Sequence, residues 1–245
     1  MSNSAPACDI VITKFLATEL NVSLPEPPVE FNHSTAVSIY NAWMRTSMVD
    51  NHGLIWVLPN RLGEILRTSK SCAHAIVENT RKEHRRSSAE GTYLRYSEVN
   101  RILSDIIQSA GSLKRERYAG YSESIGRMIR DSEKAVIQRT LSYDASREAR
   151  KKLKATRLKT LINLVDELTN ERLLRTCEFS HIRSCAVYPR LSTAVWNGLI
   201  VNKATHSLIT DRQIYDENRL LQLCREQNWN TKWYHAFKGD LSQLN

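Results

Sequence analysis

The sequence predicts an α+β protein, with a predominantly helical N-terminal region, a long basic helix, and a small module of two short strands and a helix. Apolar residues recur at helical spacing through most of the chain before residue 176. One helical stretch, from Asp144 onward, carries a dense run of lysines and arginines. After residue 176 short apolar segments alternate with polar turns, which is typical of strands.

Length and composition limit the classes of protein that fit. The chain has 245 residues, of which 41% are hydrophobic and 25% charged, enough for one large or two small domains. Its apolar runs are shorter than the roughly 18 residues of a membrane span, so we expect no membrane association. The Met1–Cys8 segment has neither a basic leader nor an apolar core, and the five cysteines form no C-x-x-C pair. We therefore expect a cytoplasmic protein without disulfides.

The charge balance is consistent with a polyanionic partner. The formal net charge is +9 at pH 7. Nucleic acids attract such proteins, but many basic proteins bind none, so charge alone leaves the partner open.

The N-terminal region, residues 1–143, is expected to be mostly helical and to bind DNA or a partner protein. Pro25, Pro27 and Pro28 predict a loop over residues 21–33. Apolar spacing predicts helices over residues 34–48, 60–79, 96–109 and 121–142, with an apolar stretch at 54–58. The basic stretch 81–86 is interpreted as a helix end or a loop.

A long basic connecting helix is predicted over residues 144–175. Its expected buried face comprises Leu158, Leu161, Ile162, Val165 and Leu168. Its first half is rich in cations, among them Arg150, Lys151 and Lys154. These three are either a solvated helix face or a ridge that contacts nucleic-acid phosphates, and both interpretations stay open.

Several enzyme classes are disfavoured by what the sequence lacks. It contains no glycine-rich phosphate loop and no G-x-S-x-G motif, and it has only eight glycines. Dehydrogenase and NTPase interpretations are therefore weak.

Residues 177–216 carry the one family resemblance that we identify. The pattern S-H-I, then W-N-G-L-I-V-N-K-A-T-H, contains His181, Asn197 and His206 in that order. It resembles the HNH endonuclease signature, written roughly A-H-I, then N-G-L-x-L-x-x-x-x-H. The resemblance implies that residues 176–245 form an HNH-like (ββα-metal) nuclease module with additional C-terminal helices.

The resemblance also implies roles for these residues in hydrolysing DNA phosphodiester bonds. His181 would be the general base, since neutral imidazole accepts a proton near pH 7. Asn197 would hold the loop in its working orientation. His206 would bind a divalent metal, Mg²⁺ or Mn²⁺ by expectation, although imidazole also accepts Zn²⁺ or Ni²⁺. Relatives of this kind occur in phages, mobile elements and antiphage defence.

One position departs from the family pattern. Many members carry a metal ligand immediately before the first histidine, where this chain has Ser180. Glu178, Asp211 or Asp216 could supply a carboxylate instead. The expected phosphate contacts in this module are Arg183, Arg190 and Lys203, because guanidinium and ammonium groups pair with phosphate oxygens.

Two alternatives to an independent nuclease remain. The chain could be a non-catalytic basic DNA-binding or regulatory protein with a degenerate HNH fold. It could also be the nuclease subunit of a multi-protein defence or mobile-element complex. A protein partner or a homo-oligomer is compatible with either.

Overall fold

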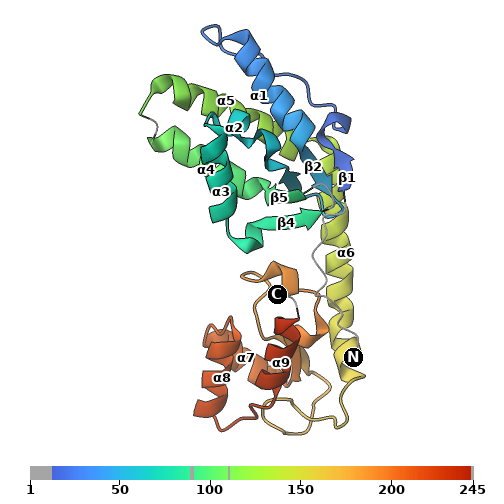
Figure 1. Ribbon diagram of the computed structural model, residues 1–245. Helices are drawn as coiled ribbons and strands as arrows, with labels where there is room; N and C mark the ends of the chain where they lie inside the picture. Colours follow the sequence, from blue (N-terminus) through green and yellow to red (C-terminus); the bar gives the residue numbers. More distant parts are fainter. Residues whose placement is uncertain (1–12, 89–90, 110, 244–245) are drawn as a thin grey trace, which may run out of the picture. The chain divides into compact units, whose positions relative to one another are not determined.

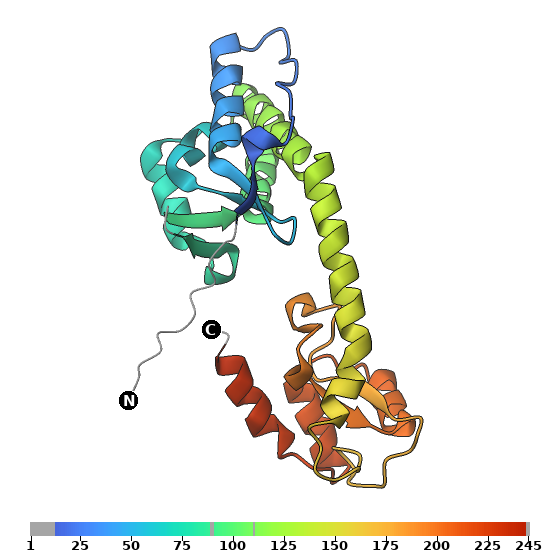
Figure 2. The same ribbon diagram turned by 90° about the vertical axis from the view of Figure 1, so that its right-hand side faces the viewer.

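The computed structural model describes residues 13–88, 91–109 and 111–243, and the chain divides into two compact units between Ser142 and Tyr143 (Figures 1 and 2). The Met1–Cys8 segment lies outside the described residues. The architecture is mixed α+β, as the sequence predicts. None of the described helices is long and apolar enough to cross a membrane. The cysteines within the described ranges are free thiols.

The first unit contains a five-stranded antiparallel sheet in the order β1-β2-β3-β5-β4. Its strands are β1 (Thr13–Leu16), β2 (Ser47–Asp50), β3 (Ile55–Val57), β4 (Arg85–Ser88) and β5 (Gly91–Arg95). The prediction of a mostly helical N-terminal region did not include this sheet, although helices still make up most of the regular structure of the described part of this unit. The strands have only three to five residues each, too few for a clear two-residue alternation in the sequence.

The turn between β2 and β3 is organised by Asp50. Its Oδ1 accepts hydrogen bonds from the backbone N–H groups of His52 (2.8 Å) and Leu54 (2.9 Å). Its Oδ2 accepts the indole N–H of Trp56 at 2.9 Å. Gly53 has φ +73°, a conformation that glycine adopts without strain. A single buried carboxylate thereby joins the two strands.

Five α-helices lie entirely within the described part of the first unit. They are α1 (His33–Thr46), α2 (Leu62–Leu66), α3 (Lys70–Asn79), α4 (Tyr96–Ser109) and α5 (Leu113–Arg130). The prediction over 96–109 is confirmed by α4. The prediction of one helix over 60–79 is wrong, because Arg67 takes a left-handed φ of +52° that ends α2. Ser69 then caps α3 by accepting the Cys72 N–H at 3.2 Å.

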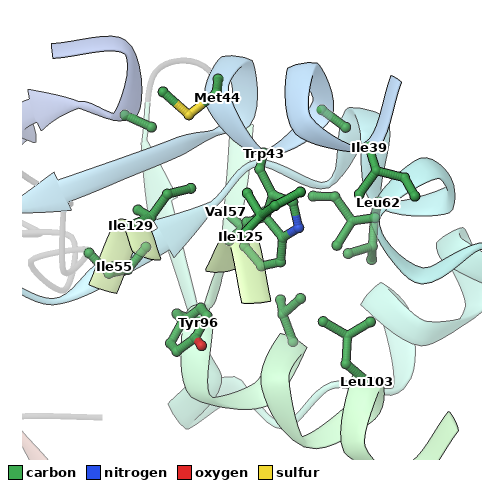
Figure 3. Packing of buried hydrophobic residues seen from close by; sticks show 14 of the residues in the cluster. Ile39, Trp43, Met44, Ile55, Val57, Leu62, Tyr96, Leu103, Ile125 and Ile129 are labelled. Carbon is green, nitrogen blue, oxygen red and sulfur yellow. The ribbon is translucent and has the colours of Figure 1, made fainter. Parts of the chain in front are cut away.

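The core of the first unit packs around Trp43, which is fully buried (Figure 3). Its indole N–H donates to the Ser122 hydroxyl at 2.9 Å, and that hydroxyl donates to the Ile65 carbonyl at 2.7 Å. A Cβ on Gly126 would lie 3.0 Å from the Trp43 ring, so a glycine lets α5 approach α1 closely. The Trp43 indole N–H and the Ser122 hydroxyl are therefore both paired inside this core.

The second unit holds the C-terminal elements. They are β6 (Glu178–His181), β7 (Gly198–Val201), α7 (Lys203–Asp211), α8 (Glu217–Glu226) and α9 (Trp233–Ser242). The additional helices expected near the C-terminus are confirmed by α8 and α9. Leu220, Leu223 and Cys224 of α8 are buried in a cluster with Leu199 and Val201 of β7.

The prediction of a basic helix over 144–175 has the wrong bounds. The helix, α6 (Glu133–Leu158), begins eleven residues earlier. The predicted helix 121–142 is therefore two helices, because α5 ends at Arg130 and α6 begins at Glu133. Beyond Leu158 the chain is irregular, and the buried Asp166 accepts the backbone N–H groups of Leu168 (2.9 Å) and Thr169 (3.0 Å). Such local bonds compete with a helix. Ile162, predicted to be buried, is 98% exposed.

Candidate active site

The strands β6 and β7 pair antiparallel, and α7 follows directly. The register places His181 opposite Gly198 and Glu178 opposite Val201. Because β7 ends at Val201 and α7 begins at Lys203, the start of this helix lies next to Glu178. The hairpin and the helix thus bring both ends of the 177–206 segment together.

A carboxylate and an imidazole meet where the hairpin joins α7. The Nδ1 atom of His206 is hydrogen-bonded to Oε2 of Glu178. This bond, with the charge of His206, lowers the pKa of the Glu178 carboxyl below its usual range, so the group is ionised at neutral pH. Both side chains are partly exposed and accessible to a ligand. Among the described residues, His, Cys, Asp and Glu form no group of three or more that could hold a metal.

His181 is oriented by the loop that follows β6. Its Nε2 lies 3.2 Å from the carbonyl oxygen of Ser192. Since a carbonyl only accepts, Nε2 carries the proton and Nδ1 of the neutral ring holds a lone pair. Burial lowers the pKa of His181, and the charges of Arg150 and His206 lower it further. The neutral imidazole is therefore the favoured form at pH 7.

Phe179 lies on the same face of β6 as His181. The two ring centroids are 4.9 Å apart, in an edge-to-face arrangement. The Phe179 ring also occupies the space beside Gly198, where an added Cβ would lie 2.1 Å from its Cζ. A glycine at this position therefore admits the ring that packs against the imidazole.

Asn197 closes the loop between the two strands. It is fully buried, and its Oδ1 accepts the Arg183 N–H at 3.0 Å. Its Nδ2 donates to the carbonyl oxygens of Arg183 (3.0 Å) and Leu191 (3.1 Å). One amide thus holds both ends of the loop that carries Ser192, the residue that orients His181.

Arg183 is held by a carboxylate that the sequence analysis did not identify. Its guanidinium donates two 2.7 Å hydrogen bonds to Glu217, which is almost completely buried. This pairing lowers the pKa of the Glu217 carboxyl. The guanidinium also lies 4.7 Å from the Tyr188 ring. Arg183, predicted as a phosphate contact, therefore braces the loop against α8. Glu217 is 34 positions from Arg183, and no local pattern connects them.

Three of the predicted phosphate contacts act electrostatically on the site. Arg150 of α6 contributes to the lowered pKa of His181. Lys154 of α6 and Lys203 of α7 contribute to the lowered pKa of Glu178. The first half of the predicted basic ridge therefore lies close to His181 and Glu178, within the second unit.

The other predicted residues are more peripheral. Lys151 is exposed and forms a 2.6 Å ion pair with Glu148. Arg190 is exposed on the short turn Pro189–Leu191. Asp211 is exposed at the end of α7, about 140° around the helix from His206. Within the described ranges no hydrogen bond or ion pair joins these two residues.

Two more carboxylates near the site have structural roles. Asp216 caps α8 by accepting the backbone N–H groups of Asn218 and Arg219, each at 2.9 Å. Asp166 accepts the Asn202 N–H (2.7 Å) and the Thr205 hydroxyl (2.8 Å), which fixes the start of α7. Asp166 was missed because the sequence predicts a helix there.

Comparison with known proteins gives no significant match to a protein-family model, a curated protein or a solved structure. The description of the site therefore rests on the side chains that form it. These are a neutral imidazole with a lone pair on Nδ1, a second imidazole bonded to a carboxylate, and three neighbouring cations.

Proposed function

We propose that the second unit is an HNH-type (ββα-metal) endonuclease module that hydrolyses DNA phosphodiester bonds with a divalent metal. The observation that carries this proposal is the Glu178–His206 pair, located on the same hairpin and helix as His181. A base and a metal-binding pair on one small unit are the two components that metal-assisted hydrolysis requires.

His181 acts as the general base in this proposal. Its Nδ1 lone pair accepts a proton from the attacking water, while Nε2 remains bonded to the Ser192 carbonyl. Burial keeps the ring neutral before the reaction. Asn197 keeps the loop, and thus the Ser192 carbonyl, in place.

Glu178 and His206 would hold the divalent ion. Carboxylate oxygen and imidazole nitrogen are both suitable donors for Mn²⁺, and Mg²⁺ is commonly held by one or two protein ligands with water and substrate phosphate in the remaining positions. A bound ion would offset negative charge on the scissile phosphate and on the leaving oxygen. The donor pair thus fits such an ion without a ligand at Ser180.

Arg150, Lys154 and Lys203 are the proposed contacts to the DNA backbone. Their charges already influence His181 and Glu178, so a phosphate held by them would lie near both groups. Lys151 and Arg190 would extend this surface. Phosphate contacts of this kind give affinity that falls steeply with added salt.

The test is nicking of supercoiled plasmid DNA by the full chain with Mg²⁺ or Mn²⁺. We expect His181→Ala to lower the rate about 10²-fold or more, as loss of a general base does. His235→Ala is the matched control, because His235 is exposed on α9, where its ring lies beside the Tyr234 ring. If no metal supports cleavage that depends on His181, the nuclease proposal fails.

That negative outcome would favour the alternative, a DNA-binding module without catalysis, for which Ser180 in place of the usual ligand is the supporting observation. Binding is tested separately with the His181→Ala protein. Lys154→Ala should weaken DNA binding and reduce its salt dependence, by a slope of about one for each lost phosphate contact. Lys152→Ala, on the same helix and exposed, is the control of equal charge.

A further inference from the structure

The helix α6 carries apolar side chains on a face that the first unit does not use. Ser132 and Ala135 are buried against that unit. Ile137 and Leu141, one helical turn apart, are 50% and 57% exposed. Neither belongs to a hydrophobic cluster of the described chain. Single exposed apolar residues are common, but two in succession on one helix face suggest a contact surface.

Opposite charges flank this apolar pair. Lys134 precedes Ile137 by three positions, and Asp144 follows Leu141 by three positions. At 100° per residue, all four side chains lie within an arc of about 80°. All four positions lie within the bounds of α6. The stripe therefore runs cation, apolar, apolar, anion along the helix.

Such a stripe is complementary to itself when two copies run antiparallel. The midpoint of the Ile137–Leu141 pair and that of the Lys134–Asp144 pair both fall at residue 139. A two-fold axis there places each Ile137 against the other copy's Leu141, and each Lys134 against the other copy's Asp144. A parallel arrangement would instead place like charges together.

We propose that this stripe is a homodimer contact, in which α6 of one chain pairs antiparallel with α6 of a second copy. Lys134 is already held near the stripe, since its ammonium donates to the Glu19 carbonyl at 2.7 Å and lies 5.3 Å from the Phe15 ring centroid. Its other two N–H donors remain available for Asp144 of the second copy. The proposal is independent of the nuclease activity.

The contact is small, because it uses about three turns of one helix from each chain. Stable interfaces usually bury more than about 1,000 Å² in total, so we expect a weak and reversible dimer. Sedimentation equilibrium over a wide range of protein concentration measures it directly. Leu141→Glu should raise the dissociation constant at least about tenfold. Val29→Glu, at a fully exposed apolar residue outside α6, should leave it unchanged.

Charge reversal gives the decisive comparison. Lys134→Glu and Asp144→Lys should each weaken the dimer, because each puts like charges opposite one another twice. The double variant should restore it. Lys134 and Asp144 lie about 15 Å apart along their own helix, so the rescue must come from contact between copies. A wild-type chain that stays monomeric throughout, or a double variant as weak as either single one, overturns the proposal.

Discussion

Glu178 and His206, 28 residues apart in the sequence, form a hydrogen-bonded pair between the first strand of the C-terminal hairpin and the helix that follows it. The pairing follows from the register, because Glu178 lies opposite Val201 and α7 begins two residues later. His206, the histidine expected to bind metal, lowers the pKa of the Glu178 carboxyl to which it is bonded.

The first prediction concerns this pair as a metal site. Ions that bind only the folded state stabilise it, by about 2.7 kcal/mol at a hundredfold excess over Kd. We expect saturating Mn²⁺ to raise the Tm of the wild-type chain, and Glu178→Ala and His206→Ala to lose that increase. Thermal unfolding with and without Mn²⁺ measures it. Asp211→Ala, on the same helix as His206, should keep the full increase, and the opposite pattern would refute the assignment.

The second prediction concerns Gly198 and Phe179. An added Cβ would lie 2.1 Å from the Phe179 ring, so Gly198→Ala must displace the ring. We expect a loss of about 1–3 kcal/mol in the free energy of unfolding, the usual range for overpacking. Urea denaturation measures it. Phe179→Ala combined with Gly198→Ala should cost less than the sum of the single changes, because the clash disappears. Additive losses would contradict this account.

The sequence contains much of the information about the hairpin and its helix. His181, Asn197 and His206 could be identified because each borders a short apolar segment, and strand ends and helix starts then lie within a few residues of one another. The helix α4 was equally predictable, since Val99 and Leu103 are buried at helical spacing and Tyr96 begins it after a short strand.

Other features depend on contacts between distant residues. Asp166, in the irregular segment after α6, bonds to Asn202 and Thr205, which are more than 35 positions away. Glu217 is buried with its carboxylate paired to Arg183, which reaches it from another loop, and to Lys238 of α9. From sequence alone, both acidic residues are expected to be exposed. Their burial is explained by the distant groups that pair with them.

The third prediction concerns Glu217. Its folded-state pKa is lowered by Arg183, so the pair stabilises the fold fully above the ordinary value of 4.5 and loses this contribution as pH falls through the folded-state pKa. Glu217→Gln should cost about 2–4 kcal/mol at pH 7, with a smaller difference at pH values below 4.5. Chemical denaturation at several pH values measures both.

Glu226→Gln, exposed at the end of the same helix, should change stability by less than about 0.5 kcal/mol. A loss of stability that is independent of pH would show that packing, not charge, is responsible.

The fourth prediction is that His181 titrates below its ordinary pKa of 6.5 and that Arg150 contributes to this shift. Burial is the largest cause, because it disfavours the charged imidazolium, and the Arg150 cation adds repulsion. Removing that cation in Arg150→Gln should therefore raise the pKa of His181, whereas Lys152→Gln should leave it unchanged. NMR titration of the His181 ring in the substrate-free chain measures the pKa without reference to catalysis. An unchanged or lowered pKa in Arg150→Gln would mean that Arg150 does not act on the imidazole.

In the nuclease proposal, the acid limb of the pH–rate profile should move to higher pH together with this pKa, because only the neutral ring accepts the proton of the attacking water.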